Sequence, residues 1–277
     1  MNEHNILIEA TNKLITLSLK KDWGNELLLK APPVMWFGDS KCEKEKILTI
    51  GANPSRWEFL NQSEMKSCLK PYQSTCYENK YLSKQRFYHL TKKETFNSIL
   101  NDEVLRNKII NSYDKYFSEN SYKWFGLNKN DSYNVEGVLR GLDASYFNIE
   151  SKFRACHIDI FPFATISDFN KIQNITERDI LANNWAKNLV DKILVYFEPK
   201  LILIFGRTNF NYFSEYFNIN KPDELKFQAN GGKGECFVWQ TQYNNYKVFG
   251  VSANLGNPKG FDAVGLKELG IYLKTSL

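Results

Sequence analysis

The sequence lacks the residue patterns that mark metalloproteins, membrane proteins and many nucleotide-binding proteins. Its 277 residues include five cysteines and three histidines. These form neither a Cys-x-x-Cys pair nor a cysteine–histidine cluster, so we expect no metal and no cofactor. No apolar run approaches the roughly 18 residues of a membrane span. The first strand-like segment is not followed by a glycine-rich phosphate loop.

The N-terminus and the cysteines give the expected location. Residues 1–4 are polar and do not resemble a secretory signal peptide. The odd number of cysteines, none closely paired, is typical of reduced thiols. We therefore expect a cytoplasmic protein that acts as a monomer and does not bind membranes. The formal net charge of +5 permits a polyanionic partner but does not require one.

Four short apolar segments, each ending at a turn signal, predict β-strands. They are residues 46–51, 155–160, 201–206 and 246–251. Helical periodicity is present at residues 6–19, 94–117, 184–197 and 266–273. This alternation predicts an α/β fold in three layers, with a central, mostly parallel four-stranded sheet between helices.

We interpret the whole chain, residues 1–277, as a single domain, because its length and 43% hydrophobic content suffice for one core. Residues 61–150 have weaker periodicity, and we interpret them as a long insertion between the first two strands. Ligands of parallel sheets bind beyond the carboxyl ends of the strands. Functional residues are therefore expected at 51–59, 159–165, 206–210 and 252–261.

The segment after the first predicted strand reads Gly51-Ala52-Asn53-Pro54-Ser55-Arg56-Trp57-Glu58-Phe59. On pattern alone, a tight turn followed by a helix capped by Ser55 is the more common interpretation. After a strand, however, Gly-x-Asn-Pro resembles the first motif of the uracil-DNA glycosylase superfamily. This form is typical of the mismatch-specific and single-strand-selective branches.

The resemblance implies a uracil-DNA glycosylase-like fold that flips a base out of DNA and hydrolyses its bond to the sugar. It implies that the side-chain carbonyl of Asn53 orients the attacking water. Ala52 and Pro54 lie where the family holds the base, and Trp57 or Phe59 is expected to stack on it. Two neighbours are expected to contact DNA: Ser55 and Arg56.

The second predicted strand places His157 and Asp159 on one face. The resemblance puts an asparagine near Asp159, reading the polar edge of the flipped base. An ionised aspartate only accepts hydrogen bonds, which suits the amine of a cytosine-type base better than uracil. A turn cap explains Asp159 equally well. His157 is a candidate for stabilising the departing base, although strand histidines are more often structural.

The segment 252–261 stands where the superfamily has its second motif, usually His-Pro-Ser followed by an apolar residue. Here it contains no histidine. Ser252 or Asn254 can donate a hydrogen bond to the departing base, and Leu255 is the expected apolar wedge in the DNA. A flexible loop is the more common interpretation of this composition.

Basic side chains add further predicted DNA contacts. Residues 77–93 interleave cations with aromatics, which suits a nucleic-acid surface. A solvated helix face with its aromatics in the core is the more common explanation. The predicted DNA-binding residues beyond the first motif are Lys84, Arg86, Arg207, Leu255, Asn257 and Lys259.

Together these features predict a monofunctional DNA glycosylase that removes a uracil-like or modified cytosine-type base and leaves an abasic site. No lysine nucleophile is implied, so strand cleavage is not expected. DNA repair and defence against phage with modified DNA are the expected settings. The alternatives are a catalytically weak or inactive relative that binds damaged or modified DNA, and an unrelated α/β enzyme acting on a nucleotide or nucleoside.

Overall fold

The computed structural model describes residues 2–28, 30–59, 86–119, 124–126, 133–219, 222–255 and 260–275. Three predicted DNA-binding residues, Lys84, Asn257 and Lys259, lie outside these ranges. The described chain is α/β, as expected, and it forms two compact units. Unit 1 comprises Met1–Trp36, Ala52–Tyr116 and Asp159–Tyr196, and unit 2 comprises Phe37–Gly51, Phe117–Ile158 and Phe197–Leu277.

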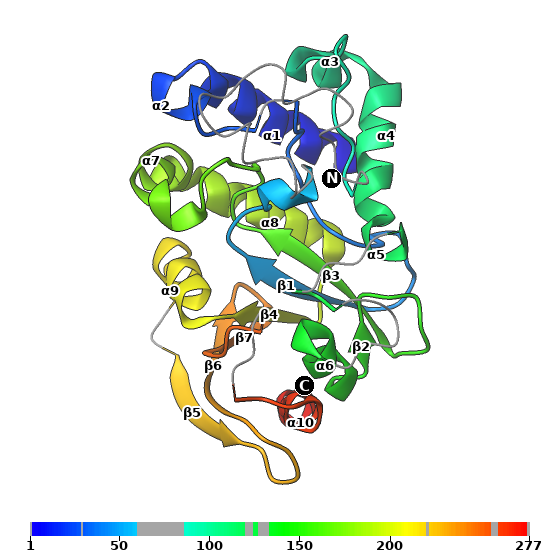
Figure 1. Ribbon diagram of the computed structural model, residues 1–277, viewed down its shortest axis with the longest axis vertical. Helices are drawn as coiled ribbons and strands as arrows, with labels where there is room; N and C mark the ends of the chain where they lie inside the picture. The colour runs from blue at the N-terminus through cyan, green and yellow to red at the C-terminus, as the bar shows by residue number, and fades with distance from the viewer. Residues whose placement is uncertain are drawn as a thin grey trace. The chain divides into compact units, whose positions relative to one another are not determined.

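Unit 2 contains a mixed seven-stranded sheet (Figure 1). The four predicted strands are confirmed, and they lie together in the order β3–β1–β4–β7. Their bounds are β1 (Lys46–Gly51), β3 (Phe153–Asp159, whose last residue belongs to unit 1), β4 (Leu201–Phe205) and β7 (Tyr246–Val251). The pairs β1–β4 and β4–β7 are parallel. All residues of β1, β3 and β4 are buried, which explains the nearly unbroken apolar runs of β1 and β4.

The predicted number of four strands is wrong, because three more strands extend the sheet. They are β2 (Ala144–Ser145), β5 (Asp223–Gln228) and β6 (Glu235–Tyr243). β2 pairs with β3 in parallel, whereas β5 and β6 continue the sheet beyond β7 in antiparallel pairs. β2 is too short to give a pattern, and Phe227 is the one buried residue of β5, so neither has an apolar run.

Three helices of unit 2 are α6 (Asn134–Gly141), α9 (Arg207–Tyr216) and α10 (Ala263–Lys274). The last contains the predicted helix 266–273. α6 and α10 lie side by side (Figure 1) and approach closely at two glycines. A Cβ on Gly270 would lie 2.0 Å from the Val138 carbonyl oxygen, and one on Gly141 would lie 2.1 Å from the Lys267 carbonyl oxygen. Only glycine permits this distance between the two backbones.

Unit 1 is helical. Its elements are α1 (Glu3–Ser18), α2 (Lys21–Gly24), η1 (Arg56–Glu58), α3 (Phe96–Asn101), α4 (Glu103–Asp114), η5 (Phe169–Lys171), α7 (Gln173–Thr176), the π-helical η6 (Glu177–Leu181), η7 (Ala182–Asn184) and α8 (Trp185–Phe197) to Tyr196. The first residue of α5 (Tyr116–Glu119) belongs to unit 1, and the rest of this helix belongs to unit 2. Within the described ranges, no helix is both long and apolar enough to span a bilayer.

The predicted helices at 6–19 and 184–197 are confirmed as α1 and α8. The predicted helix at 94–117 is interrupted at Asp102, which ends α3 and caps α4. Its carboxylate accepts a hydrogen bond from the backbone N–H of Leu105 at 3.0 Å. Aspartate is a strong N-cap residue, so a new helix starts there instead of the first one continuing.

Replacing Gly270 with alanine should destabilise unit 2, because the added methyl group must push α6 and α10 apart. We expect the free energy of unfolding to fall by about 1–3 kcal/mol. Denaturant unfolding followed by far-UV circular dichroism measures this change. Val264→Ala on the exposed face of the same helix is the matched control and should change stability little. Equal stabilities of the two variants would contradict the close contact.

Candidate active site

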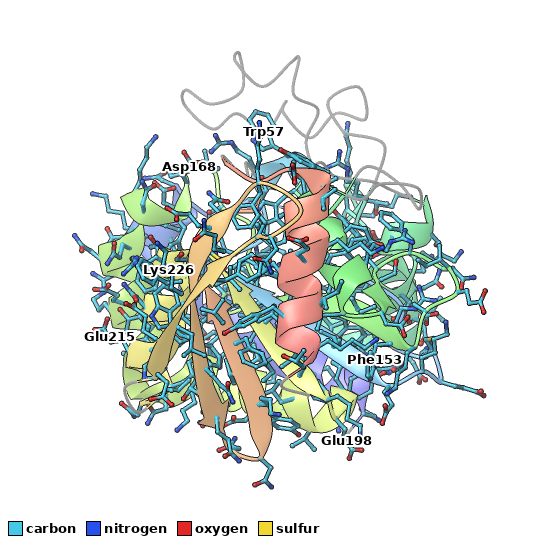
Figure 2. All side chains as sticks on the ribbon, turned by 90° about the horizontal axis from the view of Figure 1, so that it is seen from below. Trp57, Phe153, Asp168, Glu198, Glu215 and Lys226 are labelled. Atoms are coloured by element: carbon cyan, nitrogen blue, oxygen red, sulfur yellow. The ribbon has the colours of Figure 1, made fainter. Side chains whose placement is uncertain are left out.

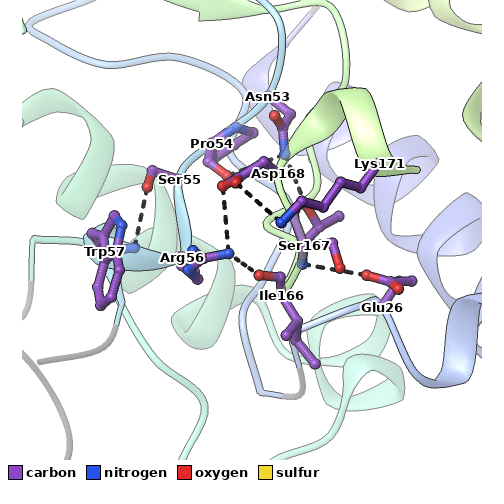
Figure 3. Close-up of polar contacts among 11 residues, drawn as sticks. Glu26, Asn53, Pro54, Ser55, Arg56, Trp57, Ile166, Ser167, Asp168 and Lys171 are labelled. Carbon is purple, nitrogen blue, oxygen red and sulfur yellow. Dashed lines mark hydrogen bonds and ion pairs between the residues drawn. The ribbon is translucent and has the colours of Figure 1, made fainter. Parts of the chain in front are cut away.

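The segment after β1 forms a turn followed by the short helix η1 in unit 1. The Ser55 hydroxyl oxygen accepts a hydrogen bond from the backbone N–H of Trp57 at 3.3 Å, so the expected cap is confirmed. Arg56 lies with its guanidinium 5.0 Å from the centre of the Trp57 ring. It also donates to the Ile166 carbonyl and pairs with Asp168 at 3.5 Å (Figure 3). Arg56 thus joins this turn to the segment that follows β3.

Two further hydrogen bonds join the same segments. The backbone N–H of Phe161 donates to the Ala52 carbonyl at 2.9 Å. The side-chain amide Nδ2 of Asn53 donates to Oγ1 of Thr165 at 3.0 Å, and Thr165 in turn donates to the Ser167 carbonyl at 2.8 Å. The first two of the four predicted functional segments are therefore in direct contact within unit 1.

The Thr165 hydroxyl fixes which way the Asn53 amide points. Its single proton is used on the Ser167 carbonyl, so Oγ1 can only accept from Asn53. The NH2 group of Asn53 must face Thr165, and the carbonyl Oδ1 must face the other way (Figure 3). Among the described residues, no donor occupies Oδ1. The asparagine therefore presents a fixed hydrogen-bond acceptor.

Asn53 lies in the wall of a small, mainly apolar pocket of unit 1. The pocket is lined by Trp23, Asn53, Phe161, Phe163, Thr165, Phe169, Ile172, Thr176 and Ile180. The rings of Phe161 and Phe169 stack with centroids 4.8 Å apart. The free space is about 10 Å³, which is room for a water molecule but not for a base. The pocket can therefore hold a water molecule beside the Asn53 side chain, between apolar walls.

Sequence reasoning did not single out the aromatic lining of this pocket. Phe161 and Phe163 follow the predicted strand directly and flank Pro162, which was the available signal. Trp23 and Phe169 come from segments distant in the sequence, for which no signal existed.

Glu58 is a second group that sequence reasoning missed, although it lies inside the quoted motif. Its side chain is buried, and its Oε2 accepts from the Tyr116 hydroxyl at 2.8 Å and from Arg86 at 3.3 Å. Burial raises the pKa of Glu58 to about 7, against the opposing effects of Arg86 and Tyr116. The charge of Asp159 contributes a smaller part of the same upward shift of the pKa. Unit 1 therefore contains a carboxyl group that titrates near neutral pH.

The structure corrects the expectation for Phe59. This side chain is 2% exposed and packs against the rings of Phe87 and His89, at centroid distances of 5.7 and 6.3 Å. It belongs to the core of unit 1 and is not available to stack on a base. Trp57 is half-buried (Figure 2). Of the two proposed stacking residues, only Trp57 has an accessible ring.

Other first-motif and basic residues of unit 1 also have defined surroundings. Pro54 and Asp159 are buried, and Ala52 is half-buried. Arg86 is held in the ion pair with Glu58, and Phe87 next to it is buried. Phe87 therefore belongs to the core and not to a nucleic-acid surface.

In unit 2, two predicted site residues are core residues. His157 is 4% exposed, and its Nδ1 is hydrogen-bonded to the Thr49 hydroxyl at 2.7 Å. The ring of Phe37 packs edge-on against it at 5.0 Å. Leu255 is fully buried. These contacts fit a structural role for His157. Leu255 is not the exposed wedge that was expected, because its side chain packs in the apolar core of unit 2.

The remaining predicted residues of unit 2 that the structure describes are half-buried or exposed. The Ser252 hydroxyl oxygen accepts from the backbone N–H of Phe237 at 2.9 Å, and Asn254 and Arg207 are exposed. In the part of the chain that the structure describes, no group of three or more histidine, cysteine, aspartate or glutamate side chains is placed to bind a metal ion.

Comparisons with protein-family models, with curated proteins and with solved structures found no match. The functional interpretation therefore depends on the geometry of unit 1 and unit 2 and on the motif after β1.

The pKa of Glu58 predicts a pH-dependent contribution to stability. The carboxyl has a pKa near 4.5 in the unfolded chain and about 7 in the folded protein. The folded state therefore favours the protonated form, and the stabilisation present below pH 4.5 is lost as the pH rises towards 7. Each pKa unit corresponds to about 1.4 kcal/mol, so the loss is roughly 3 kcal/mol.

Glu58→Gln should remove this contribution. Urea unfolding of both proteins from about pH 5 to about pH 8 measures it as the change in their stability difference. Glu136 of unit 2, whose pKa burial also raises to about 7, is present in both proteins and cancels. Parallel stability curves would show that Glu58 does not titrate in this range.

Proposed function

We propose that the protein is a monofunctional DNA glycosylase of the uracil-DNA glycosylase superfamily. It hydrolyses the N-glycosidic bond of a flipped uracil-like or modified cytosine-type base and leaves an abasic site. The observation that carries the proposal is the Asn53 amide, whose orientation Thr165 fixes beside a pocket with room for a water molecule. A fixed acceptor at that point suits the orientation of a hydrolytic water.

In the proposed reaction the base is first flipped out of the DNA. The bond from the base to the sugar C1′ then breaks, with positive charge developing on the sugar and negative charge on the base. A water oriented by Asn53 Oδ1 attacks C1′, and the proton that it loses ends on the departing base, so the products are the C1′ hydroxyl of the abasic site and the neutral free base. Ser252 or Asn254 donates a hydrogen bond to the departing base, and Trp57 provides the accessible ring for stacking. No step uses a lysine nucleophile, so the DNA strand is left intact.

We also propose that the fold is that of the uracil-DNA glycosylase superfamily. A uracil-DNA glycosylase-like arrangement of three layers is supported by the central strand order β3–β1–β4–β7. The contact between the residues after β1 and those after β3 in unit 1 supports it as well. We propose that the protein acts on DNA as a monomer in the cytoplasm, in DNA repair or in defence against phage with modified DNA.

A second candidate function is binding of damaged or modified DNA without base excision. Two observations favour it: the segment 252–261 has no histidine, and Leu255 is buried. An inactive relative would keep the turn after β1 as a structural element. The reaction itself therefore has to be measured.

Asn53→Ala should abolish release of free base, because it removes the acceptor for the water. Thr165→Val should slow a single turnover by about 10- to 100-fold, because the amide is then free to rotate. The measurement is mass-spectrometric detection of free base from oligonucleotides with different modified pyrimidines. Ser167→Ala, which keeps the carbonyl that Thr165 contacts, is the matched control. DNA binding by the wild type without any base release would favour the second candidate function.

Asp159 should determine which base is removed, if its carboxylate accepts a hydrogen bond from an exocyclic amine. The wild type is then expected to prefer cytosine-type bases, and Asp159→Asn should shift the preference towards uracil, because an amide can also donate. Competition between the two substrates in one reaction gives the ratio of their kcat/KM values. A wild-type preference for uracil would contradict this role of Asp159.

A further inference from the structure

Unit 2 carries an exposed aromatic and cationic surface where β4 and β7 end. Phe237 of β6 is 37% exposed, although it is a large apolar side chain. The guanidinium of Arg207 lies 5.6 Å from the centre of the Phe237 ring and 5.0 Å from that of Trp239. We call the exposed side chains of Arg207 and Phe237, together with the buried Trp239 on which Arg207 lies, the Arg207 surface.

The elements beneath hold the Arg207 surface in place. Arg207 is the first residue of α9, directly after β4. Phe210, one turn further along α9, stacks on Trp239 with the rings 4.9 Å apart and nearly parallel. Gly250 of β7 pairs with Trp239 and leaves the space that Phe210 fills, since a Cβ there would lie 2.2 Å from the ring. The guanidinium is therefore presented by a rigid layer of helix and sheet.

The charges around this surface leave Arg207 available to an anion. Glu224 accepts a hydrogen bond from the Trp239 ring N–H at 2.8 Å. Glu235 is paired with Lys226 at 3.3 Å, and Figure 2 shows Lys226 on the same hairpin. Among the described residues, no ion pair joins Arg207 to a carboxylate. An exposed guanidinium stacked on aromatic rings is suited to bind phosphate.

The Arg207 surface is joined directly to the segment after β7. The backbone N–H of Phe237 donates to the Ser252 hydroxyl oxygen, and the backbone N–H of Ser252 donates to the Phe237 carbonyl, both at 2.9 Å. In the proposed function, Ser252 is a candidate donor to the departing base. A nucleotide beside the flipped one would therefore come within reach of the Phe237 ring and of Arg207.

We propose that the Arg207 surface binds an unpaired nucleotide of single-stranded DNA, next to the flipped nucleotide. Its base stacks on the exposed part of Phe237, and its phosphate binds Arg207. A base inside a duplex already has both faces covered by its neighbours, whereas an unpaired base has a face free to stack on a protein ring. This inference rests on the proposed function and extends it to a preference for single strands.

The test is binding of an undamaged, fluorescein-labelled single-stranded oligonucleotide, followed by anisotropy. Phe237→Ala should weaken binding by about 5-fold or more, the effect of losing one stacked base. Arg207→Ala should lower the slope of log K against log salt concentration by about 0.7, the effect of losing one phosphate contact. Leu225→Ala is the matched control, since Leu225 is exposed on the opposite face of the same hairpin.

A second variant and a duplex substrate make the test specific. Phe237→Leu keeps an apolar side chain without a ring and should weaken binding like Phe237→Ala, with an unchanged melting temperature. Equal binding by the wild type, Phe237→Ala and Arg207→Ala would overturn the inference. An equal loss of affinity for a duplex would overturn its single-strand part.

Base release measured on the same proteins separates this inference from the proposed function. Phe237→Ala should raise KM for a single-stranded substrate and leave kcat unchanged, because the ring contacts a neighbouring nucleotide and not the reacting atoms. If the wild type releases no base but its binding still depends on Phe237, the Arg207 surface stands and the glycosylase proposal fails. If the wild type releases base but its binding does not depend on Phe237, the glycosylase proposal stands and the Arg207 surface fails.

Discussion

The hydrogen bond from Asn53 to Thr165 ties the turn after β1 to the segment after β3, and the candidate site of unit 1 depends on it. This hydrogen bond fixes the amide because the Thr165 hydroxyl donates its only proton to the Ser167 carbonyl and can therefore only accept from Asn53. An asparagine is otherwise free to rotate and to exchange its donor and acceptor ends. Here a neighbouring hydroxyl and a backbone carbonyl set the direction of the amide before any ligand arrives.

The same turn also carries a buried charge network. Glu58, five positions after Asn53, is fixed by Arg86 and Tyr116 in an apolar core that includes Phe59 and Phe87. Burial of a carboxyl group is costly unless its oxygens are hydrogen-bonded, which explains why both partners are present. One short segment thus combines a polar side chain that faces a pocket with an acidic side chain that anchors the turn to the core.

The sequence predicted the parts of this structure that depend on local pattern. The central strands follow from apolar runs buried on both faces, and α1 and α8 follow from helical spacing. The cap at Ser55 follows from Asn53-Pro54-Ser55, a common start of a helix. β5 was missed because an exposed edge strand needs no apolar run.

Burial of single side chains was harder to predict. Phe59 and Leu255 were expected at the surface, and both belong to cores, because an aromatic or aliphatic residue in a motif looks the same whether it contacts ligand or protein. The pocket around Asn53 draws residues from distant segments, and only the folded chain brings Trp23 and Phe169 to it.

Each of the two units is assembled from three separate stretches of the chain. Unit 2 needs both β1 and α10, which lie more than 200 residues apart in the sequence, so its core can close only after the ribosome has added α10. No single cut in the chain separates one unit from the other. After a protease cuts one exposed loop, both units would therefore still contain all three of their stretches. These stretches would be held together by noncovalent packing, although the backbone is no longer continuous.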